Sequence, residues 1–261
     1  MSLGIGEPDP MKSIYVLQHT DSEFLGRMED HLEGRNIRFT YMRLHTGSAL
    51  PATVEFTDAM VLLGGGPWGT AGGRDVPTLD GEVEITRACL ERDTPVIGIG
   101  LGAQILAIAA GGASEPSDLV FEVGVARRVH DGALNGYLPE RYPLAVYMRD
   151  RPVPPPGARI LAEDAAGRPA LFQVGDNAFG FTGHPGAKVT MIEDLAMEFE
   201  DAPGDLATGL EALRAAQAGL EDALVHIMAG VVQMRPHACQ GLSRAKDWAG
   251  RGPSPDRRAA R

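Results

Sequence analysis

The sequence predicts a doubly wound α/β fold, in which a mostly parallel sheet carries helices on both faces. From Ser13 to Gly112, short apolar runs alternate with segments of helical periodicity, and the connections between them are short. Three strand ends are marked by glycines, at Gly64–Pro67, Gly98–Gln104 and Gly180–Gly186. In an open α/β sheet the loops at the carboxyl ends of the strands line one crevice, so we expect these segments to meet.

The first elements follow from apolar runs and capping residues. Ser13 to Gln18 is rich in β-formers and predicts the first strand, after which Asp21 or Ser22 is suited to cap a helix. Residues Ile37 to Met42 predict a second strand, and Asp58 to Leu63 a third one that is covered on both faces. The apolar face of the first helix is expected to consist of Phe24, Leu25, Met28 and Leu32.

A second helix is predicted from Leu79 to Arg92, followed by a strand at Val96–Ile97 and a helix that starts at Ala103 and is ended by Gly111-Gly112. Further short strands, separated by turn residues, are expected at residues 119–129, 158–162, 170–174 and 178–182. From Gly186 the chain is predicted to be helical to about Arg235.

Apolar residues from Leu206 to Met234 recur at intervals of four and three, with one polar break at Gln217. Interrupting glycines favour two helices on the domain's own core, and a homo-oligomeric or partner-docking helix is the alternative. We therefore expect a leader at residues 1–11, one domain at 12–200, appended helices at 201–249 and a tail at 250–261.

Composition limits the class of protein. A formal net charge of -11 argues against nucleic acid and against an anionic membrane surface as partners. Cys89 and Cys239 form neither a disulfide framework nor a zinc-binding pattern, which indicates a cytoplasmic protein and no metal. No apolar run approaches the roughly 20 residues that span a bilayer. We expect no cofactor.

The segment from Val96 to Gly112 predicts a strand, a glycine-bearing turn and a helix, which is the local geometry of a nucleophile elbow. The residue at the tip of such an elbow presents its side chain above the sheet. Here the tip is Gly100, which has no side chain. Beside the other two glycine-marked loops, this segment is the candidate functional site.

With these three loops the chain resembles the class I (triad type) glutamine amidotransferases, especially stand-alone members similar to the glutaminase domain of GMP synthase. In that family the elbow reads Gly-x-Cys-x-Gly-x-Gln, and a later strand ends in His-Pro-Glu. The resemblance covers about Ser13 to Glu200 and implies a flavodoxin-like sheet. It also implies a cysteine that attacks the amide of glutamine, a histidine base and a glutamate that orients the histidine.

Only part of that triad carries over. Gly100 stands at the cysteine position and Gly186 at the glutamate position, so His184 alone is retained. Loss of two members predicts a pseudoenzyme with a degenerate triad. The backbone N–H groups of the oxyanion site, which the resemblance places in two loops, survive. The retained oxyanion or ligand-binding residues are Gly65, Gly66, Leu101 and Gln104.

The predicted function is a non-catalytic binding or scaffolding subunit for a ligase or synthetase, because active members of the family pass ammonia to such a partner. One alternative is a divergent amidotransferase or hydrolase that uses His184 with a water or a partner's residue. Another is a dinucleotide-binding protein, since Gly98, Gly100 and Ala103 fit a loose fingerprint, with Glu122 at the expected acidic position.

Overall fold

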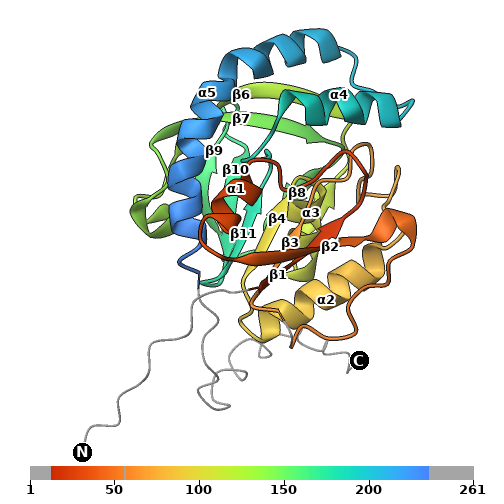
Figure 1. Ribbon diagram of the computed structural model, residues 1–261, viewed down its shortest axis with the longest axis vertical. Coiled ribbons are helices and arrows are strands. Elements are labelled where there is room, and N and C mark those ends of the chain that lie inside the picture. Colours follow the sequence, from red (N-terminus) through yellow and green to blue (C-terminus); the bar gives the residue numbers. More distant parts are fainter. Residues whose placement is uncertain (1–12, 56, 235–261) are drawn as a thin grey trace, which may run out of the picture.

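The computed structural model describes residues 13–55 and 57–234. Its centre is a nine-stranded sheet in the order β2-β1-β3-β4-β11-β10-β9-β6-β7. The strands from β2 to β11 pair in parallel, and those from β10 to β7 continue the sheet with antiparallel pairing. Helices cover both faces (Figure 1). The predicted doubly wound α/β fold is confirmed.

The strands lie close to the apolar runs of the sequence, because each run has about the length of one strand in a buried sheet. The strands are β1 Ser13–Gln18, β2 Arg38–Arg43, β3 Ala59–Leu62, β4 Val96–Ile99, β5 Ala113–Glu115, β6 Val120–Arg128, β7 Arg141–Met148, β8 Arg151–Val153, β9 Arg159–Glu163, β10 Pro169–Val174 and β11 Ala178–Phe181. The α-helices are α1 Met28–Glu33, α2 Leu79–Glu91, α3 Leu101–Ala109, α4 Val189–Glu198 and α5 Leu206–Val231.

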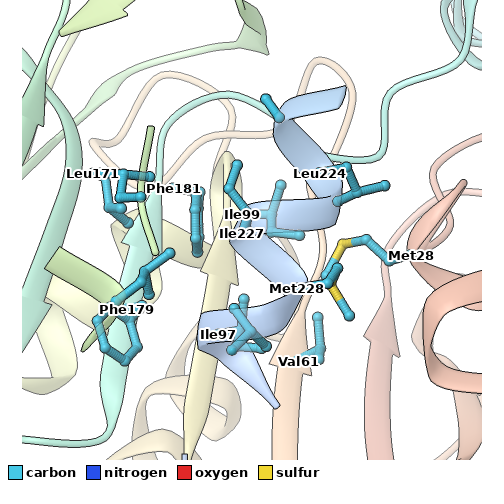
Figure 2. Close-up of a cluster of buried hydrophobic side chains, with 14 of the residues drawn as sticks. Met28, Val61, Ile97, Ile99, Leu171, Phe179, Phe181, Leu224, Ile227 and Met228 are labelled. Carbon is cyan, nitrogen blue, oxygen red and sulfur yellow. The ribbon is translucent and has the colours of Figure 1, made fainter. Parts of the chain in front are cut away.

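Alternate residues of the parallel strands face two different layers of helices. On one face, Val61 and Ile97 pack with Met28 of α1 and Met228 of α5 (Figure 2). On the other face, the strands pack with α2 and α3. A third apolar cluster joins the outer side of the β6–β7 hairpin to α4 and the first half of α5. The central parallel strands β3, β4 and β11 are therefore buried on both sides, as the continuous apolar sequence of β3 predicts.

The first helix is shorter than the sequence predicts. Instead of capping a helix, Ser22 donates its hydroxyl and its backbone N–H to the carboxylate of Glu198 on α4, at 2.6 and 3.0 Å. Helix α1 begins only at Met28. The prediction failed because a tertiary hydrogen bond took up the capping side chain, and residues 20–27 form a loop over the end of the sheet instead.

The C-terminal stripe lies on one helix rather than two. Helix α5 runs unbroken from Leu206 to Val231, and its buried face completes the core of the same chain. Glycines do not interrupt it, because they lie where the helix touches its neighbours. A Cβ at Gly209 would overlap the ring of Phe121, and one at Gly230 would lie 2.6 Å from Cβ of Leu134. The predicted leader, the predicted tail and Cys239 lie outside the described residues.

The close packing of Gly230 gives a prediction that opposes helix propensity. Propensity alone favours Gly230→Ala by about 1 kcal/mol, but the methyl group meets Leu134 Cβ at 2.6 Å and its carbonyl oxygen at 2.7 Å. We expect a net loss of about 1–3 kcal/mol in the free energy of unfolding, measured by urea denaturation. In the control Gly81→Ala on α2, the methyl meets only the end of the Leu50 side chain. That variant should be neutral or gain up to about 1 kcal/mol. Equal gains in both variants would contradict this packing.

Candidate functional site

Four neighbouring parallel strands end at the same edge of the sheet. Their order is β1-β3-β4-β11, and each is followed by a loop with polar or glycine residues. These loops begin at His19 after β1, at Leu63 after β3, at Gly100 after β4 and at Thr182 after β11. A small cavity between them is lined by residues from all but the β3 loop, including Glu23, Gly100 and His184. The sequence-predicted convergence of the glycine-marked loops is thus present at this edge.

Strand β4, Gly100 and helix α3 form the predicted elbow. Gly100 has φ of 55° and ψ of −111°, a conformation that non-glycine residues adopt only under strain, and α3 begins at the next residue. The flanking glycines are required by packing. A Cβ at Gly102 would overlap the carbonyl of Leu62, and one at Gly98 would overlap the carbonyl of Gly102. They let α3 lie directly against the sheet.

Gly100 differs from its neighbours because its surroundings leave room for a side chain. A Cβ placed there would lie 3.5 Å from Cα of Gly64 and 3.8 Å from the carbonyl oxygen of Tyr147, which are ordinary contacts. The cavity that Gly100 lines has a volume of about 10 Å³. That volume is about the minimum for one water molecule, so a glutamine does not fit in the structure as it stands.

His184 lines the same cavity but is held by the backbone. Its Nε2 donates to the carbonyl oxygen of Phe24 at 2.8 Å, and its Nδ1 accepts from the backbone N–H of Gly186 at 3.0 Å. This pattern describes a neutral imidazole with both nitrogens engaged. Burial lowers the pKa of His184 to about 4, against the opposing effect of the bond to Phe24. A histidine in this state is a poor proton acceptor at neutral pH.

Gly186 is enclosed by the loop that follows β1. A Cβ there would lie 2.6 Å from the carbonyl oxygen of Leu25 and 3.1 Å from the nitrogen of Arg27. The carbonyl of Gly186 also accepts from the N–H of Arg27 at 3.1 Å. No larger side chain fits at this position unless residues 20–27 move.

Glu23, on the same loop, reaches the predicted oxyanion donors. The backbone N–H of Gly66 donates to Glu23 Oε2 at 2.6 Å, and a Cβ at Gly64 would overlap the Glu23 carboxyl group. The residue is 4% exposed. Leu101, the first residue of α3, lies against the glycine loop after β3, because a Cβ at Gly65 would overlap the Leu101 side chain. Of the predicted oxyanion residues, Gly66 therefore has its N–H bonded to an internal carboxyl group.

A buried ion pair lies against the glycine loop after β3 and bonds to one of the carbonyl groups of that loop. His19 Nδ1 lies 3.0 Å from the carbonyl oxygen of Gly64, and its Nε2 lies 2.7 Å from Glu82 Oε2. A carbonyl only accepts, so Nδ1 carries a proton. Burial by itself would lower the pKa of His19, but the charge of Glu82 and the hydrogen bonds outweigh it, and the net shift is upward. His19 thus orients the loop through the carbonyl of Gly64.

Burial also perturbs the groups that line the cavity. Removal from water raises the pKa of Glu23 to about 7, although the bond from Gly66 and the charge of His19 act in the opposite direction. The hydroxyl of Tyr147 is buried and has no hydrogen-bond partner among the described residues. Burial and the nearby charges of Glu23 and Asp201 raise the pKa of Tyr147.

Gln104 and Glu122 have partners within the protein. Gln104 accepts from the hydroxyl of Thr70 at 2.7 Å and donates to the carbonyl oxygen of Arg149 at 2.6 Å. Its amide ties the loop after β3 to the end of β7 and is engaged by the protein's own groups. Glu122 lies on β6, in the antiparallel part of the sheet, and pairs with Arg168 at 3.1 Å. It does not approach the elbow as a ribose-binding carboxylate would.

Three site residues were not assigned to the site by the sequence analysis: Glu23, Glu82 and Tyr147. A signal existed for Glu23, since an acidic residue in the loop directly after the first strand belongs to the crevice rather than to a helix. The sequence gives no such signal for Glu82. It lies on α2, is fully buried and meets His19 only through the packing of the sheet.

A larger cavity of about 310 Å³ lies beside the β6–β7 hairpin, where its charged groups Glu122, Arg168 and Asp164 pair with one another. Among the described residues no group of three or more His, Cys, Asp or Glu side chains is placed to hold a metal. Cys89 is buried on α2, and burial raises the pKa of its thiol to about 12. No described helix is both long and apolar enough to cross a membrane. The elbow edge remains the candidate site.

Comparison with known proteins agrees with this geometry. The glutamine amidotransferase class-I family matches residues 20–193, and the chain belongs to that family. It is 26% identical over 204 residues to the glutamine amidotransferase-like protein YfeJ of Salmonella typhimurium strain LT2, covering 73% of this chain and 84% of that protein.

Two solved structures share the fold. A glutamine amido transferase from Methylobacillus flagellatus is 22% identical with a TM-score of 0.74, covering 89% of this chain and 99% of its own. A glutamine amidotransferase from Thermotoga maritima is 25% identical with a TM-score of 0.70, covering 86% of this chain and 100% of its own. The elbow, the glycine loop and the loop of His184 therefore lie on a glutamine amidotransferase scaffold.

The raised pKa of Glu23 predicts how stability depends on pH. In the unfolded chain Glu23 ionises near its usual pKa of 4.5, whereas in the folded protein it holds its proton to about pH 7. The folded state binds more protons between these values, so this group's contribution to stability falls as pH rises through that interval. Glu23→Gln cannot ionise and escapes the loss.

We expect the free energy of unfolding of Glu23→Gln, relative to wild type, to improve by on the order of 2 kcal/mol between pH 5 and pH 8. Urea denaturation across that range measures it, and the difference between the two proteins cancels contributions from groups that do not interact with Glu23. Parallel curves for the two proteins would show that Glu23 titrates as an ordinary carboxyl group.

Proposed function

We propose that this protein is a non-catalytic member of its amidotransferase family that serves as a binding or scaffolding subunit for a ligase or synthetase. The observation that carries the proposal is the tip of the elbow. Gly100 keeps the backbone conformation of a nucleophile position and has room for a Cβ, yet supplies no nucleophile. Since nucleophile and base act as a unit, its loss removes several orders of magnitude in rate.

The state of His184 supports the same conclusion. A triad base needs one nitrogen free to take the proton of the nucleophile and a partner that orients the other nitrogen. In this protein both nitrogens of His184 bond to the backbone of Phe24 and Gly186, and burial keeps the imidazole neutral. The rival proposal, hydrolysis of an amide by His184 and a water, requires the same nitrogen to be released.

The position of Gly186 and the volume of the cavity add steric support. An orienting glutamate at Gly186 would meet the carbonyl oxygen of Leu25, so the loop after β1 fills the space where such a side chain would lie. The remaining cavity of about 10 Å³ excludes glutamine. The absence of a nucleophile at Gly100 and the small volume of the cavity thus support the same proposal.

A partner is the second half of the proposal. The resemblance to class I amidotransferases implies docking on a ligase or synthetase, and the fold that supports such docking is retained. The apolar stripe of α5 is not available for this, because residues such as Leu213, Leu224 and Ile227 are buried in the chain's own core. Docking would therefore use another surface, such as the loops at the carboxyl edge of the sheet.

A glutaminase assay tests the catalytic half. We expect the purified protein to release no more ammonia from glutamine than a heat-denatured control, measured by coupling to glutamate dehydrogenase. Gly100→Cys carries the strain of this backbone conformation, although its Cβ meets nothing closer than 3.5 Å, and should also stay inactive because His184 is engaged. Ammonia release by the wild-type protein would contradict the proposal and favour the hydrolase alternative.

A measurement of native assembly tests the partner half. When the tagged protein is expressed at its natural level and purified gently, we expect it to elute with a ligase or synthetase in stoichiometric amount, identified by mass spectrometry and light scattering. A population consisting only of the isolated single chain or its homo-oligomer would contradict the subunit role. Glu198→Ala, which loosens the loop over the site through Ser22, serves as a variant that should weaken docking at this edge.

A further inference from the structure

Strand β6 extends past the end of one of its two neighbours. It pairs with β7 along nearly its whole length, but with β9 only at Arg127 and Arg128. Strand β9 ends at Glu163, and a turn at residues 164–168 leads from it into β10. Residues 120–126 of β6 therefore have one edge that no other strand of the described chain covers.

The hydrogen bonds at the end of β6 show which backbone groups lie on the open edge. The N–H of Arg128 bonds to the residue just before β7 at 2.8 Å, whereas the N–H of Val129 bonds to β9 at 2.9 Å. Backbone groups alternate in direction along a strand, so the even-numbered residues of β6 bond to β7. The N–H and carbonyl groups of Val123 and Val125 point the other way, and no strand or turn of the described residues bonds to them.

The cavity of about 310 Å³ lies along this open edge, and we call it the edge groove. Residues 122–125 of β6 line one side of it and residues of the 164–168 turn line the other, with apolar side chains of β7 between them. Gly124 leaves its side of the groove open, because a Cβ built there would meet no atom within 4 Å. The groove thus gives access to the free backbone groups of β6.

The sequence of this edge does not protect it from pairing. Natural proteins block open edges with lysine, proline or a bulge, but residues 122–125 read Glu-Val-Gly-Val, and Val125 is 43% exposed. Alternating free N–H and carbonyl groups match the backbone of another extended chain. The chemistry of the edge therefore favours a polypeptide segment as the ligand.

The charges of the edge groove indicate the composition of that segment. Three acidic side chains line it, against two arginines. Arg168 pairs with Asp164 and Glu122, and Arg151 lies 3.9 Å from the same Glu122 carboxylate. Glu115 takes part in no ion pair among the described residues. A groove with apolar side chains and an unpaired carboxylate is complementary to apolar residues accompanied by lysine or arginine.

We propose that the edge groove binds an extended segment of a partner protein, which adds to β6 as a further strand and carries apolar residues with a lysine or arginine. Its backbone bonds to Val123 and Val125, and its basic side chain pairs with Glu115. The ion pair between Arg168 and Glu122 reaches from the turn to β6, but both side chains are partly exposed. Such a pair contributes less than about 1 kcal/mol, so an entering strand can displace it.

The edge groove adjoins the candidate site. Thr182, the first residue after β11, lines both the groove and the small cavity at Gly100. A segment bound in the groove therefore lies beside the elbow. This inference goes beyond the proposed function, and it stands whether or not the protein hydrolyses glutamine.

Selection from a phage-displayed library of random dodecapeptides tests the groove with the full-length protein. We expect the selected peptides to alternate apolar residues and to contain lysine or arginine, and a synthetic copy to bind in fluorescence anisotropy. Gly124→Leu fills the groove without a clash, so it should weaken the Kd of that peptide by about tenfold or more. Glu115→Gln should weaken it about two- to five-fold, and less at high salt.

Val125→Pro tests the pairing with the backbone. Proline removes an N–H that does not bond to β7, so the β6–β7 pairing stays intact, and proline is tolerated on an open edge. We expect the Kd to weaken about five-fold, the value of one hydrogen bond, while the matched control Val125→Thr, which keeps the N–H, binds like wild type.

Two results would overturn the proposal. One is a selection that yields no binding peptide, and the other is equal binding of the selected peptide to wild type and to Gly124→Leu. If Val125→Pro does not fold, as judged by circular dichroism, Gly124→Leu decides the question alone, because its added side chain extends into open space.

Discussion

The close approach of helix α3 to the sheet is the constraint on which the site depends. Gly98 and Gly102 have no Cβ, so the first turn of α3 lies against the carbonyl of Leu62 on the neighbouring strand. That contact fixes the sharp turn at Gly100 between them. It also brings the loop after β3 within reach of the elbow, since Gly65 lies against Leu101. An alanine at either flanking position would push the helix outward and separate the two loops.

A set of buried charges is arranged around this contact. His19 bonds to Glu82 and to the carbonyl of Gly64, and Glu23 bonds to the N–H of Gly66, so the glycine loop is held at both ends by ionisable side chains. Buried ion pairs add little net stability but fix one arrangement, because an unpaired member is costly. The loop is therefore held in one arrangement by side chains of the protein itself.

The sequence predicted the central strands within one or two residues, since β1, β3 and β4 are continuous apolar runs that need burial on both faces. It misjudged segments whose conformation depends on distant partners. Ser22 was suited to cap a helix locally, yet Glu198 on α4 accepts its hydroxyl. The glycines of α5 suggested a break, yet Gly209 and Gly230 allow one long helix to touch Phe121 and Leu134. In each case a tertiary contact outweighed a local preference.

By itself, the sequence determined the α/β class, the elbow and the absence of a side chain at Gly100, because periodicity and glycine spacing are local properties of the chain. Only the tertiary structure decided which side chains lie around Gly100 and the glycine loop. Glu23 reaches Gly66 across 43 positions of sequence, and His184 reaches Phe24 across 160. Contacts over such separations depend on the order of strands in the sheet, which no local pattern encodes. The closure of the site by the loop after β1 is therefore a property of the folded chain.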